Sequence, residues 1–197
     1  MTPRPRTVDD AEIGAALGRV ITKVGPAKLT LALVAKEAGL APATLIQRFG
    51  SKRNLLVKLS QGAGDGGPLV ERLRAAGRRP LEIVREFLLC YADLAPSPIA
   101  MMHSFAAYLD IDLTDAKLRR FLVETGRRNE ALMAGLLTEA VDRGDLDCPD
   151  PKGLARALLA LPSGSLLAWV TFREGKARDW MARDVDAVLA GFRRHRR

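Results

Sequence analysis

Residues 30–56, TLALVAKEAGLAPATLIQRFGSKRNLL, limit the possible folds of this chain more than any other segment. Thr30 is a good N-terminal cap for a short helix, and Gly39 stands just past the end of that helix, where a left-handed residue is favoured. Pro42 is tolerated in the first turn of a following helix, because its missing N–H would have no partner there. Two short helices that cross closely need a small contact residue and a glycine in the turn, which Ala35 and Gly39 supply. The segment therefore predicts a helix-turn-helix.

The second of these helices has one buried and one exposed face. We expect a small core that locks the two helices together, formed by Val34, Ala38, Leu40, Leu45 and Phe49. Thr44, Gln47 and Arg48 are then left on the outward face. A glutamine can pair with adenine, an arginine can bind guanine or a phosphate, and a threonine can reach a phosphate or a thymine methyl. This face predicts a helix that enters the major groove of double-stranded DNA.

Residues on either side of the outward face suit contacts with phosphate. Lys52 lies in the first turn of the next helix, where backbone N–H groups also favour an anion, and Lys28 approaches from the opposite side. The predicted DNA-binding residues are Lys28, Thr30, Pro42, Ala43, Thr44, Gln47, Arg48 and Lys52. Any short amphipathic pair of helices can show this spacing, so the charge around it also matters.

The basic charge of the chain is concentrated at its N-terminal end. Residues 1–60 carry ten basic and four acidic side chains, a net charge of +6 out of +8 for the whole chain. The final RRHRR supplies +4, so the middle of the chain is slightly negative. A basic head on a near-neutral body indicates a polyanionic partner at one end, although a solvated basic surface would have the same composition.

The rest of the chain has helical periodicity and almost no strand signal. One helix from about residue 9 or 10 to Val24 precedes the helix-turn-helix, and another follows Ser51. Gly62–Gly67 then separate this head from a body with expected helices at about 69–77, 80–95, 98–109, 114–143, 151–174 and 177–194. The prediction is an all-α protein, with a helix-turn-helix DNA-binding domain over residues 1–60 and a larger helical domain over residues 61–197.

Composition argues against several other classes of protein. The 197 residues are 48% hydrophobic and 27% charged, which is typical of a globular protein. No apolar run reaches about 18 residues and the N-terminus lacks the apolar centre of a signal peptide, so we expect a cytoplasmic protein without membrane contact. Cys90 and Cys148 are too isolated for a disulfide framework or a zinc site. With two histidines and no catalytic motif, we expect no enzyme, metal site or cofactor.

The head resembles the tetracycline-repressor-like (TetR) family of regulators. The matching positions are Thr30, Ala35, Ala38, Gly39, Leu40, Thr44, Leu45, Phe49, Ser51, Lys52 and Leu55. The body is similar to the family only in length, helical content and its two long closing helices. The resemblance implies a head on a ligand-binding and dimerisation body, and a homodimer formed through the last two long helices. It also implies a repressor that an unknown small-molecule inducer releases from a palindromic operator.

Several residues depart from the family pattern. Ile46 stands where the family commonly has a tyrosine that contacts phosphate, Ala41 where serine is frequent, and Arg53 where glutamate is usual. Ala32 and Leu33 are unusually apolar for a helix face near DNA. Because of these departures, we expect the predicted DNA-binding residues to make a larger share of the contacts with DNA. The glycine-rich break after the head is a further departure, and it predicts a head that is more mobile than usual.

Aromatic and sulfur-containing side chains of the body are candidates for a ligand pocket. The stretch MMHSFAAY combines apolar bulk with a few polar groups, which suits a pocket, yet an interior helix with one satisfied histidine explains the same residues. The candidate pocket residues are Phe87, Tyr91, Met102, His103, Phe105, Tyr108 and Trp169. Trp169 is also a candidate for the dimer interface.

Two other functions fit parts of the sequence. Ile46 and the apolar pair Ala32 and Leu33 favour a helical small-molecule-binding dimer with weak or non-specific DNA binding. A non-specific architectural DNA binder needs wide basic surfaces beyond the head, which the body does not provide. Selection of bound sequences from random duplex DNA separates both from a specific regulator.

Overall fold

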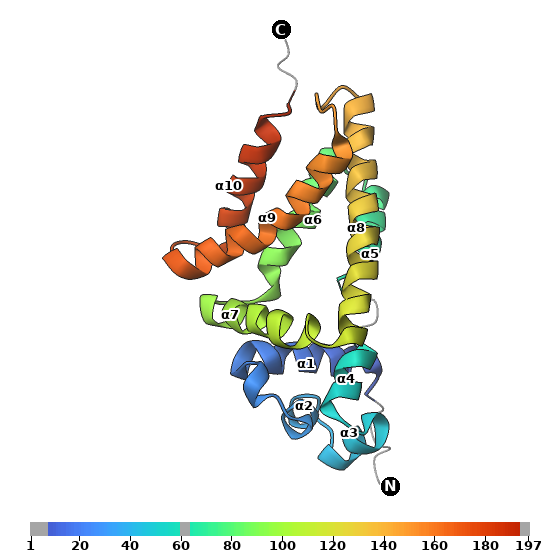
Figure 1. The fold of residues 1–197 in the computed structure, drawn as a ribbon, viewed down its shortest axis with the longest axis vertical. Helices are drawn as coiled ribbons and strands as arrows, with labels where there is room; N and C mark the ends of the chain where they lie inside the picture. The colour runs from blue at the N-terminus through green and yellow to red at the C-terminus, as the bar shows by residue number, and fades with distance from the viewer. Residues whose placement is uncertain (1–7, 60–63, 194–197) are drawn as a thin grey trace. The chain divides into compact units, whose positions relative to one another are not determined.

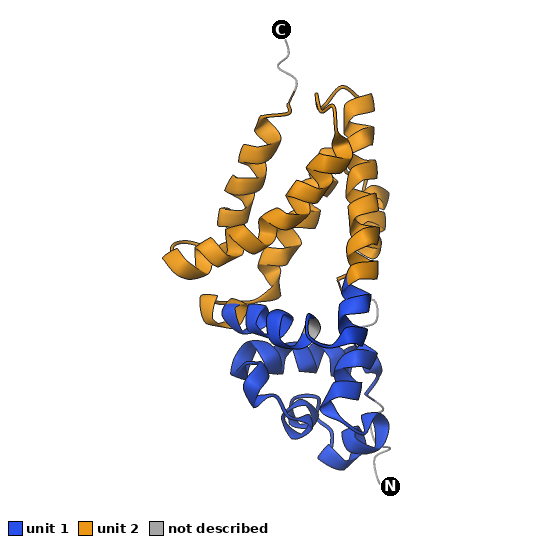
Figure 2. Cartoon of the chain, in the orientation of Figure 1, with its two compact units in different colours: residues 1–63, 102–122 blue, residues 64–101, 123–197 orange. Residues whose placement is uncertain are grey.

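The computed structural model describes residues 8–59 and 64–193. That part of the chain consists of helices and turns without a β-strand, and an isolated bridge pairs Leu146 with Arg193 (Figure 1). The all-α prediction is therefore confirmed. The chain divides into unit 1, residues 1–63 and 102–122, and unit 2, residues 64–101 and 123–197 (Figure 2). Unit 1 thus adds a segment of the predicted body to the predicted head, and the functional division at residue 60 stays a prediction.

The first helix of unit 1, α1 (Asp10–Val24), has ends that the local sequence sets. It starts in a capping box, in which Glu12 N donates to Asp9 Oδ1 at 2.8 Å and Asp9 N donates to Glu12 Oε2 at 3.2 Å. It ends at Gly25, whose φ of 78° is one that most side chains avoid. The expected start and end of this helix are confirmed.

The rest of the N-terminal part of unit 1 forms four short helices. They are η1 (Pro26–Lys28), α2 (Leu31–Glu37), α3 (Pro42–Phe49) and α4 (Lys52–Leu59). α2 packs against both α1 and α3, and α4 also contacts α1 and α3. The predicted helix-turn-helix, α2 and α3, is thus packed between α1 and α4.

Residues 102–122 of unit 1 comprise the end of α7 (Pro98–Ala107), the π-helical turn η3 (Tyr108–Asp112) and the start of α8 (Ala116–Asp142). Leu118 is 2% exposed and lies in the same apolar core as the buried residues of α1 to α4. These core residues are Ile13, Ala16, Leu17, Val20, Val34, Ala35, Leu45, Phe49, Leu55 and Leu56. Two stretches of chain far apart in the sequence therefore share one hydrophobic core.

Unit 2 contains α5 (Gly67–Ala75), α6 (Pro80–Leu89), the 3-10 helix η2 (Cys90–Leu94), α9 (Pro151–Phe172) and α10 (Ala177–Ala190), together with the greater part of α8. α10 packs against both α9 and α6. The sequence predicted one helix over residues 80–95, but the α-helix changes to a 3-10 turn at residue 90, shortly before a proline that disfavours helical backbone ahead of it.

Helix α9 is the most apolar long helix among the described residues. Pro162 is buried inside it, and the helix continues on both sides of the proline instead of dividing there. By length and composition alone α9 could cross a membrane, with a mean hydropathy of 1.4 over an 18-residue window of which 39% is buried. The sequence analysis expected no such segment. In unit 2 this helix packs against α10 and α6.

Candidate nucleic-acid interface

Helix α3, which is predicted to enter the groove, has one anchored and one exposed face. Leu45 is fully buried and Phe49 is 5% exposed, so these two side chains hold the helix in the core of unit 1. Thr44, Ile46 and Gln47 are exposed on the same helix. The exposure of Thr44 and Gln47 is what a major-groove contact requires.

The turn between α2 and α3 has the geometry that the sequence predicted. Ala35 is fully buried, and Leu40 N donates to Ala35 O at 2.8 Å across the turn. Gly39 has a φ of 71°, in the left-handed region that favours glycine. Thr30 Oγ1 accepts the backbone N–H of Leu33 at 3.2 Å, which confirms the predicted N-terminal cap of α2. Small residues and local hydrogen bonds thus fix the relation of the two helices.

The predicted phosphate-binding lysines are exposed on either side of α3. Lys52 is the first residue of α4, whose N–H groups are partly satisfied by the Ser51 hydroxyl, and Lys28 lies at the end of η1. Neither lysine forms an ion pair with a residue that the structure describes. Pro42 and Ala43 are exposed in the first turn of α3. The contact of these residues with DNA stays a prediction.

Arg48 is exposed on α3, as the sequence predicted, but its guanidinium is paired within unit 1. Its Nη1 donates to the carbonyl oxygen of Val8 at 2.7 Å, and its Nη2 lies 2.6 Å from Asp10 Oδ1. The guanidinium carbon also lies 5.7 Å from the centroid of the Phe49 ring. A guanidinium has five N–H donors, of which the Val8 carbonyl oxygen and the Asp10 carboxylate engage two, and a partly exposed ion pair of this kind contributes about 0–1 kcal/mol. The sequence analysis missed Asp10 as its partner.

Arg53 binds a carboxylate from a distant part of unit 1. Its Nε donates to Asp115 Oδ2 at 2.5 Å and its Nη2 donates to Asp115 Oδ1 at 3.2 Å. Asp115 Oδ1 also accepts the backbone N–H groups of Lys117 and Leu118 at the start of α8. The hydrogen bond from Arg53, assisted by these backbone groups, lowers the pKa of Asp115. Sequence analysis missed Asp115, although an aspartate just before a helical run is a cap signal.

The candidate pocket residues are divided between the two units. Those in unit 1 are Met102, His103, Phe105 and Tyr108, and those in unit 2 are Phe87, Tyr91 and Trp169. His103 Nδ1 lies 3.0 Å from the carbonyl oxygen of Thr22, near the end of α1. The His103 ring also lies so close to Gly25 that a Cβ atom there would be 3.1 Å from Cδ2. His103 therefore fits the alternative of a satisfied interior histidine.

Two of the unit 2 candidates pack as core side chains. Phe87 is 1% exposed and covers Gly66, where an added Cβ atom would lie 1.9 Å from Cε2 of the ring. The rings of Phe87 and Tyr91 are tilted by 50°, with their centroids 6.4 Å apart. Trp169 is 5% exposed, and its Nε1 donates to the carbonyl oxygen of Gly175 at 3.2 Å. The role of these residues in a ligand pocket stays a prediction.

The described part of the glycine-rich break is held by hydrogen bonds. Gly66 N donates to Asn129 Oδ1 at 3.0 Å, and Asn129 Nδ2 donates to the carbonyl oxygen of Gly64 at 2.8 Å. Asn129 is 5% exposed, so these bonds are largely shielded from water. Residues 60–63 lie outside the described residues. Where the break is described, Asn129 of α8 holds its backbone, and the mobility of the head stays a prediction.

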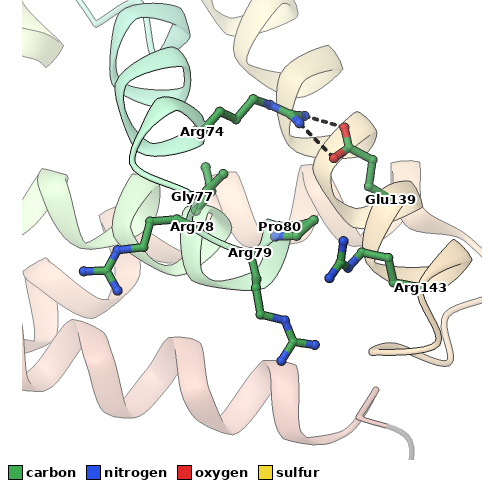
Figure 3. Close-up of a pocket in the computed structure, with 8 residues that line it drawn as sticks. Arg74, Gly77, Arg78, Arg79, Pro80, Glu139 and Arg143 are labelled. Carbon is green, nitrogen blue, oxygen red and sulfur yellow. Dashed lines mark hydrogen bonds and ion pairs between the residues drawn. The ribbon is translucent and has the colours of Figure 1, made fainter.

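A cavity of about 220 Å³ in unit 2 has four arginines among its eight lining residues (Figure 3). The lining residues are Arg74, Gly77, Arg78, Arg79, Pro80, Ile83, Glu139 and Arg143. Arg74 binds Glu139 through both terminal nitrogens, and Asp145 binds Arg79 at 2.5 Å and Arg143 at 3.5 Å. The Arg74–Glu139 pair joins α5 to α8, and the single carboxylate of Asp145 is shared by Arg79 and Arg143. None of the candidate pocket residues lines this cavity.

Comparison with known families gives a match for the head. Residues 13–59 match the family model described as bacterial regulatory proteins, tetR family. This span includes the helix-turn-helix, α2 and α3, and reaches the end of α4. A comparison with curated proteins gave no significant match.

Solved structures share the fold over nearly the whole chain. A TetR-family transcriptional regulator from Rhodococcus sp. has a TM-score of 0.68 at 21% identity, covering 91% of this chain and 98% of that one. The regulator FadR from Bacillus subtilis, in complex with stearoyl-CoA, has a TM-score of 0.63 at 19% identity, covering 93% and 99%. A transcriptional regulator from Saccharomonospora viridis, in complex with choline, has a TM-score of 0.70 at 19% identity, covering 94% and 98%. At these identities the likeness shows the fold.

Proposed function

We propose that this chain, whose residues 13–59 match the tetR family of bacterial regulatory proteins, is a repressor that a small-molecule ligand releases from a palindromic operator. Residues 1–60 are the DNA-binding domain in this proposal, and residues 61–197 are the ligand-binding and dimerisation domain. Regulators of this family are generally non-enzymatic. We place the protein in the cytoplasm, where bacterial DNA lies.

The exposed face of α3 is the observation that carries the proposal. Thr44 and Gln47 are exposed on a helix whose opposite face is fixed by Leu45 and Phe49. A glutamine amide can bind adenine through two hydrogen bonds, and such a pair contributes about 1–3 kcal/mol of discrimination against a wrong base. Ile46 is 55% exposed on the same helix, and an apolar side chain suits the methyl group of thymine. This face can therefore read bases, while Lys28 and Lys52 contact phosphates.

A homodimer is needed to read a palindrome. Two recognition helices must lie about 34–36 Å apart to enter successive major grooves on one face of the duplex. Helix α9 has a stripe of exposed small and apolar side chains at three- and four-residue spacing, formed by Ala157, Ala160, Gly164 and Leu167. Leu167 is 58% exposed. We place the dimer interface on this stripe and on the adjoining α10, because exposed apolar surface of this kind marks a contact with another chain.

The ligand is proposed to act on the distance between the two recognition helices. FadR from Bacillus subtilis holds stearoyl-CoA and the Saccharomonospora viridis regulator holds choline, so this fold accommodates chemically unlike ligands. Met102 and Tyr108 are 48% and 43% exposed within unit 1, which leaves them able to contact a ligand. A ligand releases the protein from DNA only if it binds better to an arrangement that does not fit the operator.

Selection of bound sequences from random duplex DNA at near-physiological salt tests the proposal. We expect a palindrome whose half-sites are about 10–10.5 base pairs apart, centre to centre. Gln47→Ala should relax the preference at one position of each half-site, at a cost of about 1–3 kcal/mol against the best sequence. Lys152→Ala removes an exposed cation of unit 2 and should leave the selected sequence unchanged.

Two other outcomes would each favour another function. Recovery of no shared motif by a folded, dimeric protein would favour a helical small-molecule-binding dimer with weak or non-specific DNA binding. Steep salt dependence without sequence preference would favour an architectural DNA binder.

A further inference from the structure

The carboxylate of Asp10 lies between cations from two helices of unit 1. Arg48, at the end of α3, places Nη2 2.6 Å from Asp10 Oδ1, and Lys58 of α4 places Nζ 3.3 Å from Asp10 Oδ2. Both cations also lie over the ring of Phe49, with Lys58 Nζ 5.2 Å from its centroid. Arg48 donates in addition to the carbonyl oxygen of Val8. One carboxylate therefore holds a cation of the recognition helix and a cation of the helix that follows it.

Asp10 has no part in capping α1. The Asp9 side chain accepts the backbone N–H of Glu12 in the first turn, and the Glu12 side chain accepts the backbone N–H of Asp9 to close the capping box. Asp10 is the first residue inside the helix, and its side chain is 41% exposed. An uncharged side chain of the same shape would leave the start of α1 in place. The charge of Asp10 favours the helix dipole in the first turn, but no backbone N–H group of α1 depends on its side chain.

A DNA duplex offers Arg48 and Lys58 an alternative anion. Each lysine or arginine that neutralises a phosphate releases a condensed counterion, which raises affinity and makes the salt dependence steeper. Contacts of this kind carry no direct sequence information. While Asp10 binds these two cations, they do not add to the affinity for DNA of any sequence. Affinity then depends more on the side chains that can reach base edges, Thr44 and Gln47.

We propose that Asp10 takes the place of a DNA phosphate within unit 1 and limits the sequence-independent affinity of the protein for DNA. This inference rests on the proposed DNA-binding function. It makes Arg48 a cation that Asp10 restrains, and not a reader of bases. With a net charge of +6 over residues 1–60, the head has several other cations that could bind phosphates on any sequence, so a restraint on two of them changes only part of this affinity.

The variant Asp10→Asn tests the proposal, because it removes the charge and keeps the shape of the side chain. Affinities for the selected operator and for a random duplex of equal length are measured between about 50 and 200 mM salt. The slope of log affinity against log salt should steepen by about 0.9 for each phosphate newly contacted. Across this fourfold range of salt, each new contact adds about a 3.5-fold change in affinity. Both duplexes should show it, and the selected sequence should stay the same.

Second substitutions identify the cations that Asp10 restrains. Arg48→Gln and Lys58→Gln are each made in the Asp10→Asn background. If the removed cation is one that contacts a phosphate in that variant, the slope should become less steep by about 0.9. Asp110→Asn is the matched control, since Asp110 is an exposed acid of unit 1 that forms no ion pair with a described residue. It changes the net charge by the same amount and should leave the slope unchanged.

The outcomes separate this inference from the proposed function. Wild-type protein that binds its operator, together with an Asp10→Asn variant whose slope equals that of Asp110→Asn, would overturn the role of Asp10 alone. A changed selected sequence with an unchanged slope would also overturn it, because Arg48 would then be reading a base. Wild-type protein that binds neither duplex would overturn both. Thermal unfolding is measured for each variant, and Asp10→Ser, which suits a helix start, replaces Asp10→Asn if that variant is unfolded.

Discussion

Helices α1 and α8 both begin in unit 1 beside an aspartate that binds an arginine. The two starts differ in whether that same aspartate also caps the helix. At the start of α1, Asp9 caps the helix and Asp10 is left to bind Arg48. At the start of α8, Asp115 accepts backbone N–H groups of the helix and binds Arg53 as well. The hydrogen bond from Arg53 lowers the pKa of Asp115, so the folded state favours its ionised form.

The difference shows how one kind of ion pair can serve two purposes. Where one carboxylate both caps a helix and binds an arginine, loss of that carboxylate removes the ion pair and weakens the helix start as well. Where a neighbour supplies the cap, the second carboxylate can change the charge that the surface presents without affecting the fold. We therefore expect substitutions at the start of α8 to change stability, and substitutions of Asp10 to change mainly DNA binding.

The largest expected effect tests whether the start of α8 belongs to the core of unit 1. Leu118→Ala should lower the free energy of unfolding by about 2–5 kcal/mol, because the side chain is 2% exposed and its removal leaves a cavity. Urea unfolding followed by circular dichroism measures the loss, and hydrogen exchange locates it in unit 1. Val123→Ala, at a position 46% exposed on the same helix, is the control and should cost less than about 0.5 kcal/mol. Equal losses would contradict the shared core.

The second prediction separates the two aspartates of α1. Asp9→Ala should lower the free energy of unfolding by about 0.5–2 kcal/mol, because Glu12 N loses the side-chain oxygen that it donates to at 2.8 Å. Asp10→Ala should cost less, because no backbone N–H of the helix depends on its side chain. Urea unfolding of both variants gives the comparison. A larger loss for Asp10→Ala would show that its ion pairs hold unit 1 together and do not simply restrain two cations.

The third prediction separates the two roles of Asp115, the ion pair with Arg53 and the cap of α8. Arg53→Glu brings two carboxylates together and should lower stability by less than Asp9→Ala, because Arg53 is 55% exposed and salt screens the repulsion. The loss should therefore shrink between about 0.05 and 0.5 M salt. In the double variant Arg53→Glu with Asp115→Arg, the charge pair returns without the cap, so stability should recover only in part. Full recovery in urea unfolding would mean that the cap contributes nothing.

Local signals explain why the helices of the head could be predicted. The cap at Thr30, the left-handed turn at Gly39 and the proline at the start of α3 each depend on residues within a few positions along the chain. The alternation of buried and exposed residues on α3 follows from the helical period in the same way. These features are properties of short segments, and the structure confirms them.

The partners of Arg48 and Arg53 could not be predicted from local sequence. Asp10 lies near the beginning of the chain and Asp115 lies far beyond α4, so only the packing of α1 and α8 brings the pairs together. A helical period can place Arg48 outside the core, but it cannot show whether an anion stands beside it. The same reason applies to the candidate pocket residues, because the packing of long helices decides which side chains meet.

The smallest expected effect is the acid dependence of the pair at the start of α8. The pKa of Asp115 is lowered in the folded protein, whereas an aspartate in an unfolded chain has a pKa of about 3.9. The stabilisation from its charge is therefore fully present above about pH 5, and it is lost as the pH falls below about 4 towards the lowered pKa. Asp115→Asn keeps a capping side chain and removes the charge, so its stability should differ from that of the wild type above pH 5 and converge with it in acid. Urea unfolding between about pH 3 and 7 measures the difference, and the same substitution in an Arg53→Ala background should show a weaker acid dependence. A difference that grows as the pH falls would mean that Arg53 does not hold the carboxylate in its charged form.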